Sequence, residues 1–223
     1  MPPSPDNIRG LAFFDFDGTI VPSDVVDQYL WFVRKRWSVM RLVKLLLHAR
    51  SLKRADRKSR RLFNELFYAH YRGLRRDWLI QQGRVLSEVY LRPKVYPKAP
   101  DLLDRTKAEG FLPVLVTGSL DVAIGPLAES LGFTRVIANS LEYEDGVATG
   151  RIRPPIIAEN QKVLEMLRLC RECVIEPSAC RAYSDDTSDL PMLEAVGHPA
   201  AANPKPELRR LAGERGWPIE ELQ

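Results

Sequence analysis

Two aspartates separated by one residue, Asp15 and Asp17, follow an apolar run near the start of the chain. Residues 11–14 have the composition of a strand covered on both faces, and Gly18 permits a tight turn directly after it. Two carboxylates in this position can hold a hard cation through oxygen atoms, or one can attack an electrophile while the other transfers a proton. The pair alone leaves open a solvated, Asp-rich turn after a strand.

A second polar segment, Thr117-Gly118-Ser119, follows another predicted strand over residues 112–116. A helix is expected to start near Asp121. A hydroxyl and a glycine between a strand and a helix N-terminus present side-chain and backbone donors to an anion. The segment is therefore either a phosphate-binding loop or an ordinary strand-to-helix turn.

Lys162 and three clustered aspartates come later in the chain. Lys162 stands near the start of a predicted helix over residues 159–171, where the helix dipole disfavours a cation unless an anion lies nearby. Asp185, Asp186 and Asp189 fall within five residues, and carboxylates so close repel one another unless a cation or amides compensate them. The pattern favours a metal site for the aspartates, and it leaves a surface position open for Lys162.

In this order, the four segments resemble the motifs of the haloacid dehalogenase superfamily. Asp15-Phe16-Asp17-Gly18-Thr19-Ile20 is similar to the first motif, DxDGT followed by an apolar residue. Thr117 matches the second motif, Lys162 the third, and residues 182–193 the fourth. Ser184 and Asp186 depart from the fourth motif, which commonly has glycine and serine at these places. The chain resembles the phosphoserine-phosphatase-like branch (subfamily IB), which places a helical cap between its first two motifs.

The resemblance implies a Mg²⁺-dependent phosphomonoesterase that acts through an aspartyl-phosphate. In this reading Asp15 is the nucleophile, and Asp17 protonates the leaving oxygen and then activates water. The Asp15 carboxylate, the Asp17 main-chain carbonyl and Asp185 bind the metal.

Further roles are implied for residues around these three. Thr117, the Gly118 amide and Lys162 would hold the phosphoryl oxygens. Asp189, and Asp186 with it, would orient Lys162 or a water beside the metal.

Asp24, nine residues after Asp15, matches an acid that meets the substrate's amino group in related phosphoserine phosphatases. Phosphoserine or histidinol phosphate would suit such an acid. A strongly basic cap would instead suit a more anionic substrate or a lipid phosphate, and both alternatives stay open. A third is a non-catalytic phosphate-binding module, which the complete set of charged motif residues disfavours.

The elements that position these residues predict an α/β fold with a doubly wound, mainly parallel, Rossmann-like sheet and an inserted helical cap. Apolar residues recur at three- and four-residue spacing through residues 22–95, whereas strands and helices alternate afterwards. We therefore expect a catalytic core over residues 1–21 and 96–223 and a helical cap over residues 22–95.

The predicted cap is strongly basic. Between Arg34 and Arg61 there are twelve Lys or Arg residues and a single acid, Asp56. Such a run keeps a helix solvated, attracts an anionic substrate, or lies on an anionic membrane. In the last case Trp31, Phe32, Trp37 and residues 45–47 would insert. No nucleic-acid-binding motif accompanies the charge, so a nucleic-acid partner is not expected.

Bulk composition narrows the class of protein. The 223 residues are 45% hydrophobic with a formal net charge of +4, which is ordinary for a globular chain. The three cysteines fall within residues 170–180 and do not form a disulfide framework. No apolar run approaches the ~18 residues of a membrane span, and the first residues lack a signal pattern. We expect a cytoplasmic enzyme acting on a small phosphorylated substrate.

Overall fold

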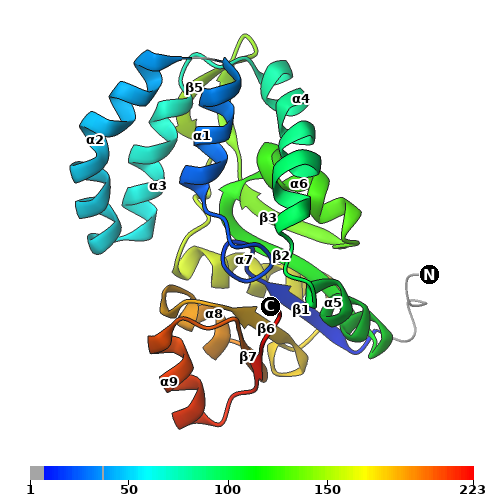
Figure 1. Cartoon of the computed structure of the whole chain (residues 1–223). Helices are drawn as coiled ribbons and strands as arrows, with labels where there is room; N and C mark the ends of the chain where they lie inside the picture. Colours follow the sequence, from blue (N-terminus) through cyan, green and yellow to red (C-terminus); the bar gives the residue numbers. More distant parts are fainter. Residues whose placement is uncertain (1–7, 37) are drawn as a thin grey trace.

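The computed structural model describes residues 8–36 and 38–223 (Figure 1). Within these residues a six-stranded parallel sheet has the order β3-β2-β1-β6-β7-β8, and β4 and β5 form an antiparallel hairpin. The strands are β1 (Gly10–Phe14), β2 (Phe111–Leu120), β3 (Arg135–Asn139), β4 (Leu141–Glu144), β5 (Val147–Ile152), β6 (Arg181–Ser184), β7 (His198–Ala202) and β8 (Ile219–Glu220). The predicted α/β class with a parallel sheet is confirmed.

Helices cover both faces of the sheet. They are α5 (Ala99–Ala108), α6 (Asp121–Ser130), α7 (Asn160–Cys173), α8 (Leu190–Glu194) and α9 (Pro206–Arg215). Ala12 and Phe14 of β1 belong to an apolar cluster with α5 and α6, whereas Leu11 and Phe13 belong to one with α7, α8 and α9. Because successive side chains of a strand point to opposite faces, all five residues of β1 are buried.

The strand order determines where a ligand can bind. From β1 the sheet extends through β2 and β3 on one side and through β6, β7 and β8 on the other. In open α/β sheets, ligands bind beyond the carboxyl ends of the strands at such a switch point. Asp15 follows β1, Thr117 lies near the end of β2, and Asp185 follows β6.

A layer of helices lies between β1 and α5 in the chain. It contains α1 (Val25–Arg36), α2 (Val39–Lys58), α3 (Arg60–Tyr68) and α4 (Arg76–Leu86), then a π-helical turn over Ser87–Leu91. Short 3₁₀ turns cover Ala69–Tyr71, Arg92–Lys94, Pro177–Ala179 and Thr187–Asp189. The helical prediction for residues 22–95 agrees with this, apart from residues 22–24, breaks at Ser38 and Ser59, and a turn at Gly73, whose amide donates to the Ala148 carbonyl of β5. The exact division into core and cap stays a prediction.

Aromatic side chains fill the interior of the helical layer, including Tyr29, Phe67 and Tyr71. Phe32 and Leu45, which the sequence placed among the membrane-inserting residues, are only 1% and 8% exposed because they pack into this interior. That part of the prediction is wrong. Trp37 lies outside the described residues. Among the helices described, none combines the length and apolarity needed to cross a membrane.

Candidate active site

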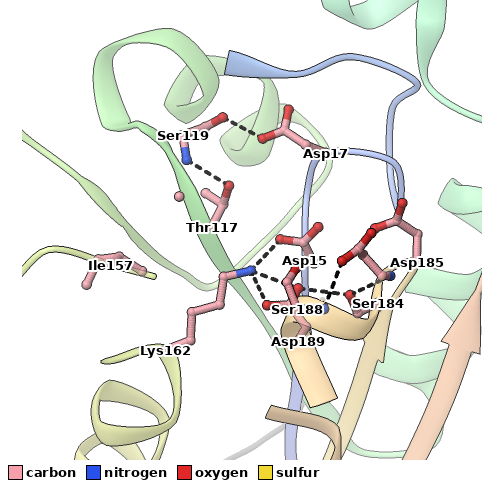
Figure 2. Close-up of polar contacts among 12 residues, drawn as sticks. Asp15, Asp17, Thr117, Ser119, Ile157, Lys162, Ser184, Asp185, Ser188 and Asp189 are labelled. Carbon is pink, nitrogen blue, oxygen red and sulfur yellow. Dashed lines mark hydrogen bonds and ion pairs between the residues drawn. The ribbon is translucent and has the colours of Figure 1, made fainter. Parts of the chain in front are cut away.

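Asp15 and Lys162 form a buried ion pair at the carboxyl edge of the sheet (Figure 2). Lys162 Nζ lies 2.7 Å from Asp15 Oδ1 and 2.8 Å from Asp189 Oδ1, and Ser184 Oγ donates to Asp189 over 2.9 Å. Burial raises the pKa of Asp15, although Lys162 opposes the shift. Burial alone would lower the pKa of Lys162, but the two carboxylates outweigh it and hold the ammonium charged.

Asp17 is held by groups from two different elements. Ser119 Oγ donates to Asp17 Oδ2 over 2.6 Å, and Gln28 Nε2 of α1 donates to Asp17 Oδ1 over 3.1 Å and to Ser119 Oγ over 3.0 Å. Burial raises the pKa of Asp17 to about 7, with the Ser119 hydrogen bond opposing the shift. A carboxyl with this pKa can give and take a proton near neutral pH. Figure 2 shows Asp17 turned toward Ser119 and away from Lys162.

Asp185 lies against the turn that follows β1. Gly18 has φ +83°, and a Cβ at that position would stand 2.2 Å from Asp185 Oδ2, so only glycine leaves room for this carboxylate. Burial raises the pKa of Asp185 to about 6, and Lys205, whose Nζ is 3.2 Å away, opposes the shift.

Asp186 makes contacts of a different kind. Its Oδ2 pairs with Lys205 at 2.7 Å, and its Oδ1 accepts from the Ser188 amide at 2.8 Å. Burial opposes ionisation, but these contacts prevail and lower the pKa of Asp186 to about 2. Both carboxylate oxygens of Asp186 are therefore engaged within the protein. This suits a residue that positions Lys205 and the 3₁₀ turn over Thr187–Asp189.

Thr117 and Gly118 lie beside this group at the end of β2. Thr117 is fully buried, and its Oγ1 accepts from the Ser119 amide at 3.0 Å. The Gly118 carbonyl accepts from Tyr68 Oη and Asn139 Nδ2, both at 2.7 Å. These bonds fix the peptide between Gly118 and Ser119, which directly follows the predicted phosphate-binding donors.

A cavity of about 320 Å³ lies over most of these groups, but the fully buried Thr117 and Ser119 are not part of its lining. The sheet edge supplies Asp15, Asp17, Gly118 and Asp185, helix α7 supplies Lys162, and the helical layer supplies Val25, Asp56, Arg60 and Asn64. Asn64 is 1% exposed, and its Nδ2 has no hydrogen-bond partner within the described part of the chain. A buried donor without a partner is costly, so a ligand acceptor is expected to meet it.

Asp24 lies outside the lining of this cavity. Its Oδ1 accepts from the amides of Val26 and Asp27 at 2.8 and 2.9 Å, which caps the N-terminus of α1. Its charge still contributes to raising the pKa of Asp17. The role of Asp24 in substrate binding stays a prediction.

The predicted magnesium ligands fit a hard cation chemically. Asp15 and Asp185 are buried carboxylates, and burial raises the pKa of both, so a bound cation would favour their charged forms. Within residues 8–36 and 38–223 no three His, Cys, Asp or Glu side chains converge as a ready metal shell. The predicted set needs only two carboxylates, since its third ligand is the Asp17 main-chain carbonyl, with waters completing the shell.

Several residues of the site were not predicted from the sequence. Gln28, Arg60, Asn64 and Lys205 reach it from helices or loops whose local patterns carry no catalytic signal. Ser119 could have been noticed, because it stands two residues after Thr117 in the same polar segment.

Comparison with known proteins places the chain in a family. The model of the haloacid dehalogenase-like hydrolases matches residues 12–194. A probable phosphatase of Mycobacterium tuberculosis is 35% identical over 154 residues, which cover 67% of this chain and 53% of the relative. A phosphoserine phosphatase of the same organism is 29% identical over 98% of this chain and 73% of its own length. The chain spans about half the length of the first of these relatives.

Solved structures share the fold. A protein of unknown function from Bordetella pertussis Tohama I has a TM-score of 0.85 at 27% identity, covering 97% of this chain and all (100%) of that one. A phosphoserine phosphatase in apo form has a TM-score of 0.69 at 20% identity, covering 96% and 94% of the two chains. The parallel sheet and the grouping of motif residues at its carboxyl edge agree with the family match. The chain therefore belongs to the haloacid dehalogenase-like hydrolase family.

Proposed function

We propose that this protein is a Mg²⁺-dependent phosphomonoesterase that acts through an aspartyl-phosphate on a small phosphorylated metabolite. The observation that carries the proposal is the Asp15 carboxylate, bound to Lys162 through Oδ1, beside Asp17 and under the cavity. Among the described residues Oδ2 of Asp15 accepts no hydrogen bond, which leaves a lone pair free to attack phosphorus.

In the first step, Asp15 Oδ2 forms a bond to phosphorus while the bond to the ester oxygen breaks. The departing oxygen takes the proton of the Asp17 carboxyl, whose pKa of about 7 allows it to be protonated near neutral pH. Lys162 and the donors of Thr117 and Gly118 hold the phosphoryl oxygens as charge shifts.

In the second step, a water attacks phosphorus and gives its proton to the Asp17 carboxylate as the bond from Asp15 to phosphorus breaks. Phosphate leaves, and both aspartates return to their starting states. Mg²⁺, held by Asp15, Asp185 and the Asp17 carbonyl, would supply charge neutralisation for the dianionic phosphoryl group.

The size and the lining of the cavity favour a small substrate that carries a carboxylate or carbonyl oxygen next to its phosphate. Its volume of about 320 Å³ is at the lower end for ligand sites. Arg60 and the unpartnered Asn64 amide face the same space and can both donate to a carboxylate. A phosphorylated amino acid such as phosphoserine fits these donors, and histidinol phosphate, which lacks a carboxylate, serves as the contrasting substrate. The cytoplasmic location stays a prediction.

The test is hydrolysis of an aryl phosphate, phosphoserine and histidinol phosphate, with Mg²⁺ and with a chelator, by the intact chain and by Asp15→Asn. Uncatalysed monoester hydrolysis is so slow that loss of the nucleophile should abolish turnover. Asp145→Asn, in the turn between β4 and β5, is the matched control and should keep full activity. Metal-dependent turnover by Asp15→Asn would refute the mechanism. Phosphate binding with no turnover of any substrate would favour the non-catalytic module.

A further inference from the structure

Helix α2 forms the outer edge of the helical layer (Figure 1). Of its 20 residues, only Leu45, Leu52 and Ala55 are buried. These three lie on one side of the helix at spacings of seven and three residues, which is the side that packs on the rest of the protein. The opposite side faces away from the described parts of the molecule.

The first half of α2 carries a cluster of exposed apolar side chains. Their exposed fractions are 72% for Val39, 67% for Met40, 40% for Leu42, 42% for Val43, 65% for Leu46 and 75% for Leu47. At 100° per residue these positions spread over the side away from Leu45 and Leu52. Single exposed apolar residues are ordinary, but six within nine residues form a patch of the kind that marks an interaction surface.

The second half of α2 carries exposed cations on the same outer side: Arg50, Lys53, Arg54, Arg57 and Lys58. Within the described part of the chain, none of the five has a carboxylate within ion-pair distance. The single acid of the helix, Asp56, pairs with Arg60. The surface therefore joins an uncovered apolar patch to a group of unneutralised positive charges.

We propose that the outer face of α2 docks this protein on the surface of an anionic lipid membrane. The apolar half enters the boundary between headgroups and acyl chains, and the cations of the other half contact the phosphate headgroups. A second copy of the chain would bring another such face, which has no carboxylate to neutralise these cations. Charge complementarity therefore favours a lipid surface as the occupant. The proposal goes beyond the phosphatase activity, since it makes no use of the cavity.

The experiment is flotation of the full chain with vesicles of phosphatidylcholine alone and of equal parts phosphatidylcholine and phosphatidylglycerol. We expect flotation with the anionic vesicles only, weakened by high salt. Two double variants, Leu46→Ser with Leu47→Ser and Arg54→Gln with Arg57→Gln, should each weaken vesicle binding by about tenfold or more. The matched control combines Leu164→Ser on α7 with Arg84→Gln on α4, both exposed, and should float like the unaltered chain.

Three outcomes overturn the proposal. The first is absence of binding to the anionic vesicles, and the second is equal binding by the α2 variants and the unaltered chain. The third is a dimer in sedimentation that dissociates on changing Leu46 and Leu47, which would assign the face to a second copy. Turnover of a soluble phosphate by the α2 variants should stay unchanged, so failure of vesicle binding and failure of the phosphatase mechanism are distinguished in the same preparations.

Discussion

Ser119 connects the chemistry of Asp17 to the end of β2. Its hydroxyl donates to Asp17 Oδ2 over 2.6 Å and accepts from Gln28. In Ser119→Ala the carboxyl loses its orientation toward the leaving oxygen, so turnover of alkyl phosphates should fall about tenfold. Aryl phosphates with acidic leaving groups need little protonation and should lose much less.

Rates measured across a series of leaving groups check this prediction. Ser130→Ala, whose hydroxyl bonds only to the Leu127 carbonyl in the described chain, is the control and should behave like the unaltered protein. An equal loss for alkyl and aryl substrates in Ser119→Ala would indicate a general structural defect.

Gly18 is needed at the turn after β1 for two separate reasons, its φ of +83° and its contact with Asp185. In Gly18→Ala the methyl group must displace the Asp185 carboxylate, and the left-handed backbone costs about 1–2 kcal/mol. We expect loss of Mg²⁺-dependent turnover together with a lower free energy of unfolding in urea. Gly125→Ala, in α6 with no atom within 4 Å of the new methyl group, should retain turnover and be no less stable. Full activity of Gly18→Ala would contradict the placement of Asp185.

At the scale of elements, Glu159 links helices α3 and α7. It directly precedes α7, its Oε1 accepts from the Arg60 amide at 2.7 Å, and its Oε2 lies 3.4 Å from Ser59 Oγ at the N-terminus of α3. A carboxylate near the positive ends of two helices is favoured by their dipoles. It therefore holds the helix that presents Arg60 and Asn64 against the sheet edge.

Replacing Glu159 should alter substrate binding more than chemistry. Glu159→Gln keeps the hydrogen-bond acceptor but loses the charge, which is worth about 0.3–1 kcal/mol, so KM should rise about two- to fivefold with kcat little changed. Glu159→Ala should raise KM further. Glu172→Gln, at the other end of α7, is the control. An unchanged KM in Glu159→Ala would show that the two helix ends do not depend on this contact.

At the scale of the whole molecule, the buried carboxylates make stability depend on pH and on metal. Burial raises the pKa of Asp185 to about 6 and of Asp17 to about 7, against ~3.9 in an unfolded chain. Between pH 4 and these raised pKa values, the folded state binds more protons than the unfolded chain. The stabilisation that Asp17 and Asp185 contribute is therefore complete below about pH 4 and is lost as pH rises through 6 and 7. Mg²⁺ favours the charged carboxylates and should oppose this loss.

Thermal unfolding between pH 5 and 8, with Mg²⁺ and with a chelator, tests the linkage. The rise in Tm on adding Mg²⁺ should grow with pH, and Asp185→Asn should flatten the metal-free profile relative to the unaltered chain. The comparison with that variant is required because His70 also titrates with folding. Burial and the neighbouring His48 lower the pKa of His70, so its contribution to stability rises with pH, opposite to that of the carboxylates. A Mg²⁺ effect that is equal at every pH would exclude the linkage.

The α/β class, and the segments that carry the candidate site residues, could be predicted because their signals are local. The runs before Asp15 and Thr117 each combine a predicted strand with its own turn, and the aspartates at residues 185–189 are marked by their crowding. That the four segments form one site was implied by their resemblance to the family's motifs, since Lys162 was predicted on a helix and not at the end of a strand.

Contacts between distant segments were not predictable, because they depend on how the helical layer packs on the sheet. Gln28 meets Ser119 across 91 residues, and Arg60 meets Glu159 across 99. The same packing buries Phe32 and Leu45 and leaves Leu46 and Leu47 exposed, although all four lie in the segment predicted to be helical. Helical periodicity shows that an apolar side exists, but the neighbours of a helix determine which of its apolar residues they cover.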